Sequence, residues 1–267
     1  MLTENNHPPF SQDTPVRQPE RTEGSEQKTF DAAAVYAEIE KDEVIPKTLI
    51  QLLSTDTELA SLYAADAGVS EGYSVEQHTE MVLTQFERYF SHRMEKENRA
   101  FMRVVLALHD IGKPVSLRET GGVKKQHAYT LPVLSRVLAQ MSYPPEAISF
   151  AQAVVNQDYI GELLKGNLLL SDPDFKKTRA EIQARARENS ITPEEYLKFI
   201  RIFYLADASS YTADTAELGG TESLDFLFSF NHEKRRVKFS ENPLWLIDFE
   251  TPADYYRTFE DAVLRSY

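Results

Sequence analysis

A helix-like apolar run that ends in an adjacent histidine and aspartate constrains this chain most. Residues 106–114 read Leu-Ala-Leu-His-Asp-Ile-Gly-Lys-Pro, so the run delivers His109 and Asp110 and then stops at Gly-Lys-Pro. Neutral imidazole suits transition metals and carboxylate suits harder cations, so the pair predicts the start of a hydrolytic metal site. Two ligands alone do not hold a metal ion. Further ligands are therefore expected on neighbouring helices.

His78 is the first of these. It lies in a helix predicted at 74–91, where Ser74 and Gln77 have the spacing of a capping box at the helix start. His78 falls on the apolar stripe of that helix, which consists of Val75, Val82, Phe86, Tyr89 and Phe90. A lone buried histidine is commonly a core residue, so His78 becomes a ligand candidate only beside the pair at 109–110.

Asp207 interrupts a second apolar stripe. The segment 192–195, Thr-Pro-Glu-Glu, opens a predicted helix whose stripe consists of Tyr196, Phe199, Ile200 and Phe203. The next inward position is Asp207. An ionised carboxylate on a buried face is costly unless it is paired or bound to a metal. One cation shared with His78 would explain both interruptions.

The order His78, His109-Asp110, Asp207 resembles the HD superfamily of metal-dependent phosphohydrolases, and 109–114 is the usual wording of its His-Asp region. The resemblance covers roughly residues 73–210. It implies an all-α HD-domain helical bundle in which these four residues bind one divalent cation, with Mn, Mg, Ni, Co and Fe as candidates. It also implies hydrolysis of a phosphomonoester or phosphodiester, such as a nucleotide or a substrate modified by a nucleotide or phosphate. Asp110 is counted among the catalytic residues.

Two further segments compare with members that bind two metals. The segment 126–132 looks like the one that supplies another histidine, here His127. His127 could bind a substrate phosphate or shuttle a proton, bind a second metal, or cap a helix starting near Thr130. Residues 154–161 contain no histidine where such members often place one, so one tightly bound ion is expected. Asp158 could be a weak ligand, a hydrogen-bond acceptor for a ligand histidine, part of the substrate site, or the N-cap of a helix from Ile160.

Basic residues follow the His-Asp pair. Lys113 occupies the position that superfamily relatives use to reach a substrate oxygen; the alternative is a lysine favoured by the dipole at a helix C-terminus. Arg118, Lys124 and Lys125 surround the Gly121-Gly122 pair in a predicted mobile loop. A basic loop near the site suits substrate phosphates at its rim.

Two other functions remain open. One is a non-catalytic partner-binding protein that keeps an HD fold and a structural cation. The other is an iron oxygenase of the same superfamily, although such members usually need the fuller histidine set that residues 154–161 lack.

Composition limits the partners and the compartment. The 267 residues carry a formal net charge of -13. This charge would repel a nucleic-acid duplex, so we expect a small phosphorylated or nucleotide substrate instead. There is no cysteine, so disulfides and thiolate metal sites are excluded. No membrane span or secretory signal is evident, so a cytoplasmic location is expected, with export by a route lacking a classical signal peptide as the alternative.

The rest of the chain is predicted to be one helical domain, 30–267, behind a disordered tail. The tail, 1–29, carries four prolines among polar residues and could serve a protein partner. A small hairpin is predicted at 224–239. Helices are predicted at 31–40, 47–53, 57–67, 74–91, 96–110, 131–141, 145–157, 173–189, 193–209 and 252–265.

Overall fold

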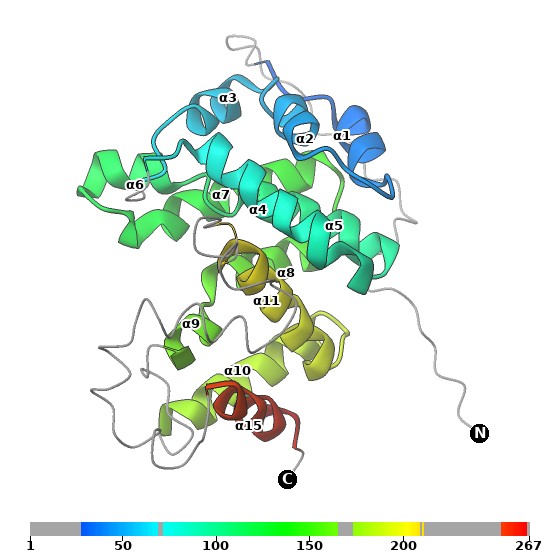
Figure 1. The fold of residues 1–267 in the computed structure, drawn as a ribbon, viewed down its shortest axis with the longest axis vertical. Helices are drawn as coiled ribbons and strands as arrows, with labels where there is room; N and C mark the ends of the chain where they lie inside the picture. The colour runs from blue at the N-terminus through cyan, green and yellow to red at the C-terminus, as the bar shows by residue number, and fades with distance from the viewer. Residues whose placement is uncertain (1–27, 69–71, 165–172, 209, 211–251, 266–267) are drawn as a thin grey trace. The chain divides into compact units, whose positions relative to one another are not determined.

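The computed structural model describes residues 28–68, 72–164, 173–208, 210 and 252–265 (Figure 1). Within these residues every regular element is a helix, so the prediction of a predominantly helical protein is confirmed there. The predicted hairpin at 224–239 and almost all of the predicted tail lie outside the described residues. In the described part, no helix has the length and apolar character needed to cross a membrane.

Contacts within the chain divide it into two compact units. The first comprises the described residues up to Glu87 together with Ser91–Asn156, and the second comprises Arg88–Phe90 and the described residues from Gln157 onward. Each unit is described by itself below.

The first unit contains eight α-helices, several of which contact one another directly. α1 contacts α2 and α5, and α7 contacts α5, α6 and α8 (Figure 1). The bounds are α1 (Ala32–Ile39), α2 (Pro46–Leu53), α3 (Thr57–Tyr63), α4 (Val75–Tyr89, of which the last two residues belong to the second unit), α5 (Lys96–Leu108), α6 (Lys113–Thr120), α7 (Gln126–Gln140) and α8 (Pro145–Asn156).

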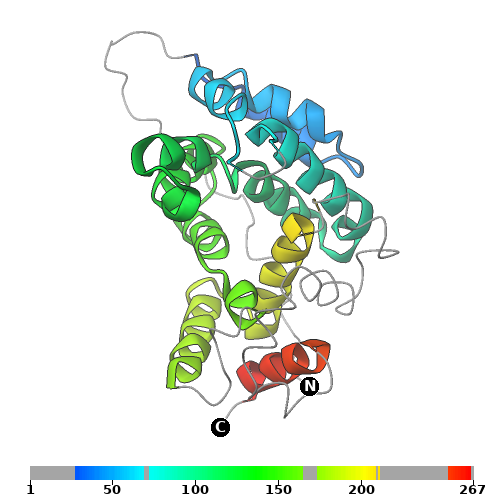
Figure 2. The same cartoon turned by 60° about the vertical axis from the view of Figure 1, so that its left-hand side comes forward.

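The second unit contains four described α-helices: α9 (Tyr159–Leu164), α10 (Pro173–Glu188), α11 (Pro193–Ala208) and α15 (Pro252–Leu264). α11 contacts the other three, and α15 also contacts α10 (Figure 2). The rings of Phe175 and Phe259 join α10 to α15 at 5.8 Å between centroids. The predicted terminal helix at 252–265 is therefore confirmed.

Side chains that cap the helices explain where several of them begin. Asp31 and Asp56 accept hydrogen bonds from backbone N–H groups in the first turns of α1 and α3. Thr192 and Glu195 form a reciprocal capping box at α11, because the Glu195 N–H donates to Thr192 and the Glu195 carboxylate accepts from the Thr192 N–H. These polar residues precede apolar periodic runs, which is why the sequence located these helices well.

α5 is the most deeply buried helix of the first unit. Every residue from Ala100 to Leu108 is buried, as expected for a helix covered on all sides. Arg103 is the one charged residue in that stretch and is fully buried. Its Nε and Nη2 donate to the two carboxylate oxygens of Glu87 on α4, at 2.7 and 2.6 Å. Its Nη1 donates to the carbonyls of Ile39 and Lys41, which tie α5 to the end of α1.

The Arg103–Glu87 ion pair joins the two helices that carry the His78 and His109 side chains. His78 lies on α4 with Glu87, and His109 directly follows α5, which holds Arg103. A bidentate pair fixes both the separation and the rotation of two helices, because each carboxylate oxygen has its own guanidinium partner. The pair therefore fixes the frame from which the histidines project.

We predict that Arg103→Ala lowers the free energy of unfolding by about 3 kcal/mol, because it leaves Glu87 and the Ile39 carbonyl without a buried cationic donor. Urea unfolding followed by circular dichroism measures this loss. Arg99→Ala is the matched control: Arg99 lies on the same helix but pairs with Asp42, whose side chain is 98% exposed, so a change below about 1 kcal/mol is expected. Equal losses in the two variants would contradict the role given to Arg103.

Candidate metal centre

His78 enters the site from the first turn of α4. The predicted capping box is present, because Ser74 Oγ accepts from the Gln77 N–H at 3.2 Å and Gln77 Oε1 accepts from the Ser74 N–H at 2.9 Å. This reciprocal pair fixes the start of the helix at Val75, three residues before His78. The His78 side chain is fully buried, as its place on the apolar stripe predicted.

His109 and Asp110 lie in a tight turn between α5 and α6. α5 ends at Leu108, His109 is its C-cap, and α6 begins at Lys113. The His109 Nδ1 lies 2.7 Å from the Leu106 carbonyl oxygen. A carbonyl oxygen can only accept, so Nδ1 carries the proton and donates. In the neutral ring the lone pair is then on Nε2, the nitrogen that faces Asp110.

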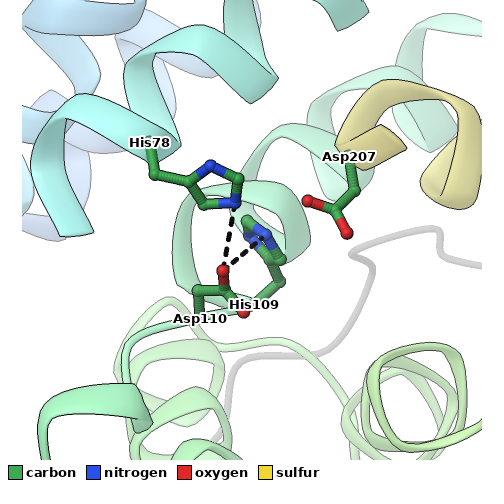
Figure 3. Close-up of side chains that lie close together, drawn as sticks. All are labelled: His78, His109, Asp110 and Asp207. Carbon is green, nitrogen blue, oxygen red and sulfur yellow. Dashed lines mark ion pairs between the residues drawn. The ribbon is translucent and has the colours of Figure 1, made fainter. Parts of the chain in front are cut away.

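The Asp110 Oδ2 atom is the point at which the two imidazoles meet (Figure 3). It lies 3.1 Å from His78 Nε2 and 3.4 Å from His109 Nε2, and all three side chains are buried. The imidazole rings themselves are 5.5 Å apart between centroids and tilted by 47°. Three potential ligand atoms, one from α4 and two from the turn after α5, thus converge on one small volume.

The hydrogen bond made by His109 Nδ1 determines what that volume can hold. If His109 is neutral, a nitrogen lone pair faces a carboxylate oxygen, and this arrangement repels unless a cation or a second proton lies between them. Burial strengthens the repulsion, because little water screens it. Neutral nitrogens beside a carboxylate are the donor set that Mn, Fe, Ni and Zn accept in proteins. The residues present therefore fit a divalent cation.

The four residues selected from the sequence form a group that could hold a metal ion. His78, His109, Asp110 and Asp207 each offer one possible ligand atom (Figure 3), and within the first unit the ligand atoms of His78, His109 and Asp110 all lie within 4.8 Å of one another. Asp207 belongs to α11, in the last turn before that helix ends at Ala208. It is half-buried, whereas the other three are buried.

Lys113 does not lie at a helix C-terminus, the position that the helix-dipole alternative required. It is the first residue of α6, at a helix N-terminus, where the dipole disfavours a cation. That alternative is therefore wrong. The side chain is buried, and its ammonium pairs with Asp110 Oδ2, the oxygen that faces both histidines. An ion pair with a buried carboxylate explains how a lysine is tolerated at this position.

The loop predicted around Gly121-Gly122 is shorter than expected, because only these two glycines lie between the helices on either side. Arg118 lies within α6, which ends at Thr120 with Gly121 in the left-handed conformation, φ +71°, that glycine adopts most easily. Lys124 and Lys125 follow in a short 3-10 helix, Val123–Lys125. All three basic side chains are exposed, and Arg118 pairs with Glu119 at 2.9 Å. None of them belongs to the group that could hold a metal ion.

The helix predicted from Thr130 starts earlier, at Gln126. His127 is consequently the second residue of α7 and does not cap a helix near Thr130; its side chain is half-buried. The displaced start places Pro132 inside α7, where it cannot donate to the Ala128 carbonyl four residues earlier. Ala128 is exposed, so water can satisfy that carbonyl. This explains why the proline does not end the helix.

Asp158 caps the start of a helix, which is one of the roles that the sequence predicted for it. Its Oδ1 accepts from the Gly161 N–H at 2.9 Å, and it directly precedes α9. A Cβ at position 161 would lie 2.0 Å from Asp158 Oδ2, so glycine is needed for the carboxylate to approach the backbone. Asp158 is exposed and lies outside the group of four.

Tyr63 is a contact of the site that the sequence did not reveal. It is buried on α3, and its hydroxyl donates to the Ala107 carbonyl at 2.7 Å, two residues before His109. Burial, with a smaller contribution from Glu76, raises the pKa of Tyr63 above its ordinary value, so the hydroxyl keeps its proton and remains a donor. Tyr63 thus helps to hold the last turn of α5. Nothing in the sequence of α3 predicts this hydrogen bond.

The chain matches no protein-family model, no curated protein and no solved structure.

We predict that His109→Ala weakens Mn²⁺ binding by more than about 100-fold, beyond the loss usual for residues that only support a ligand. Elemental analysis after dialysis and isothermal titration calorimetry both measure this. Helicity by circular dichroism should change little, because His109 lies at a helix end.

His92→Ala is the matched control, since His92 is an exposed histidine outside the group of four. It should bind Mn²⁺ as the unaltered protein does. Metal content in His109→Ala equal to that of the control would exclude His109 as a ligand.

Proposed function

We propose that this protein is a metal-dependent phosphohydrolase of the HD type. One observation carries the proposal: the His78 and His109 Nε2 atoms converge on Asp110 Oδ2, while the proton on His109 Nδ1 directs the Nε2 lone pair toward the same place. Asp207 is the fourth ligand in this proposal, because its place in the order His78, His109-Asp110, Asp207 resembles that of the superfamily. The order and wording of these residues supply the resemblance to the superfamily.

A divalent cation at this site would lower the pKa of a bound water and polarise a phosphoryl oxygen. The residues of the chain hold it in place. The imidazoles bind through fixed nitrogens, and the charge of Asp110 offsets part of the charge of the cation. Burial of the three side chains excludes bulk water and strengthens each of these interactions. Mixed nitrogen and oxygen ligands suit several divalent metals, so Mn, Mg, Ni, Co and Fe are all candidates.

Lys113 is proposed to contact the substrate. Its ammonium pairs with the carboxylate that would bind the metal, so it lies beside the place where a metal-bound phosphoryl oxygen would be. A fixed cation there stabilises the negative charge that develops on the transferring group. Because the lysine is buried, its charge is screened less than that of a surface lysine.

The substrate is proposed to be a phosphomonoester or phosphodiester, such as a nucleotide or a group modified by a nucleotide. The net charge of -13 disfavours a long nucleic-acid duplex. Exposed Lys124 and Lys125 come directly before α7, and His127 lies in the first turn of that helix. These three residues are the proposed contacts for a substrate phosphate, with Arg118 beside them in sequence.

We predict that Lys113→Ala keeps the metal but lowers kcat by about tenfold to a thousandfold, the loss expected when one electrostatic stabiliser is removed. Phosphate release is measured after reconstitution with Mn²⁺, first on bis(p-nitrophenyl) phosphate and p-nitrophenyl phosphate and then on nucleotides and cyclic nucleotides. Lys96→Ala, an exposed lysine at the start of α5, is the control and should leave kcat unchanged.

Two results would count against the proposal in different ways. An unchanged kcat in Lys113→Ala on the best substrate would remove Lys113 from the reaction while leaving the hydrolase assignment intact. Absence of phosphate release from every compound by metal-loaded protein would contradict the hydrolase assignment itself. Turnover that requires dioxygen would favour the oxygenase.

A further inference from the structure

The turn that carries Asp110 and Lys113 rests directly on the backbone of α7. A Cβ at Gly112 would lie 2.4 Å from the Thr130 nitrogen and 2.6 Å from the Gln126 carbonyl oxygen. No side chain fits in that space. The φ of Gly112 is -88°, a value that any residue can adopt, so glycine is needed here for the close approach of α7 and not for its conformational freedom.

One hydrogen bond joins the backbone of the turn to a side chain of α7 at this contact. The Gly112 N–H donates to Thr130 Oγ1 at 3.1 Å, and both residues are buried. The neighbouring N–H groups bond differently: Ile111 donates to Leu108 and Lys113 donates to Asp110, both within the same short segment. The Gly112–Thr130 bond therefore ties the turn to a different helix, whereas these two neighbouring bonds only shape it locally.

We propose that Thr130 is a positioning residue for the metal centre: by holding Gly112 against α7, its hydroxyl fixes the direction in which Asp110 and Lys113 point. This inference rests on the metal site proposed above. Asp110 lies two residues before Gly112 and Lys113 one residue after it, so a rotation of the Gly112 peptide moves both side chains. Thr130 itself touches neither the metal nor the substrate in this account.

The role proposed for Thr130 depends on its hydroxyl as a hydrogen-bond acceptor and not on the shape of the side chain. Valine has nearly the same shape as threonine but no hydroxyl, so Thr130→Val removes the acceptor with little change in side-chain volume. The Gly112 N–H is then buried without its partner, and the turn shifts to find another acceptor. Residues that orient metal ligands in this way typically change metal affinity by about 10- to 100-fold.

The test compares Mn²⁺ affinity across variants of the full chain, by isothermal titration calorimetry at a temperature where every variant is folded. Thr130→Val should bind Mn²⁺ about 10- to 100-fold more weakly than the unaltered protein. Thr130→Ser restores the hydroxyl and should bind within about threefold of it. Thr130→Cys keeps only a weak acceptor and should lie between the two.

A control on the same helix separates positioning from general loss of stability. Val137 is fully buried on α7 and takes no part in the Gly112–Thr130 hydrogen bond. Val137→Ala therefore destabilises the packing of the helix while it leaves that bond in place. Its Mn²⁺ affinity should stay within about threefold of the unaltered protein.

The outcomes are distinguishable. Loss of affinity in Thr130→Val with recovery in Thr130→Ser supports the inference. Equal affinity in Thr130→Val and the unaltered protein, or equal losses in Thr130→Val and Val137→Ala, overturns it while leaving the metal site standing. If Thr130→Val does not fold, the other two variants decide. A higher Mn²⁺ affinity in Thr130→Ser than in Thr130→Cys supports the inference, and equal affinities overturn it. An unaltered protein that binds no Mn²⁺ overturns the metal site and the inference together.

Discussion

The buried carboxylate oxygen of Asp110 is the atom on which the described site depends. An isolated carboxylate in the interior is strongly unfavourable, and here two imidazole nitrogens and one ammonium gather around it. The surrounding structure keeps them there: Arg103 and Glu87 join the helices that carry the histidines, and Tyr63 and Thr130 hold the two ends of the turn. Helical packing and the proposed chemistry thus share one electrostatic centre.

The periodicity of apolar residues identified the candidate ligands in the sequence. A histidine on the stripe of α4 and an aspartate on the stripe of α11 interrupt otherwise apolar faces, and an interruption of a buried face by a polar residue requires a partner. Capping residues located the helix starts for the same local reason: Ser74 with Gln77 and Thr192 with Glu195 lie three residues apart, a spacing that the structure realises as reciprocal hydrogen bonds.

Tertiary contacts decided what local reasoning could not. The glycines at 121 and 122 suggested a loop that included Arg118, yet α6 extends to Thr120. The same helix places Lys113 at its start, where pairing with Asp110 outweighs an unfavourable dipole. α7 begins at Gln126 although Pro132 is unsuited to a helix interior, and its first turns pack against Gly112. Arg103 is a charge within the apolar stretch 100–108 of α5, and such a charge requires a buried partner, as Asp207 does.

Anomalous diffraction at the manganese edge, from crystals grown with Mn²⁺, tests the central claim most directly. The account predicts one strong peak about 2.0–2.3 Å from His78 Nε2, His109 Nε2 and an Asp110 carboxylate oxygen, with Asp207 as a further ligand. It also predicts that the Lys113 ammonium leaves Asp110 Oδ2 when the ion binds there. A peak at other residues, or no peak while the ammonium still occupies Asp110 Oδ2 at saturating Mn²⁺, would contradict it.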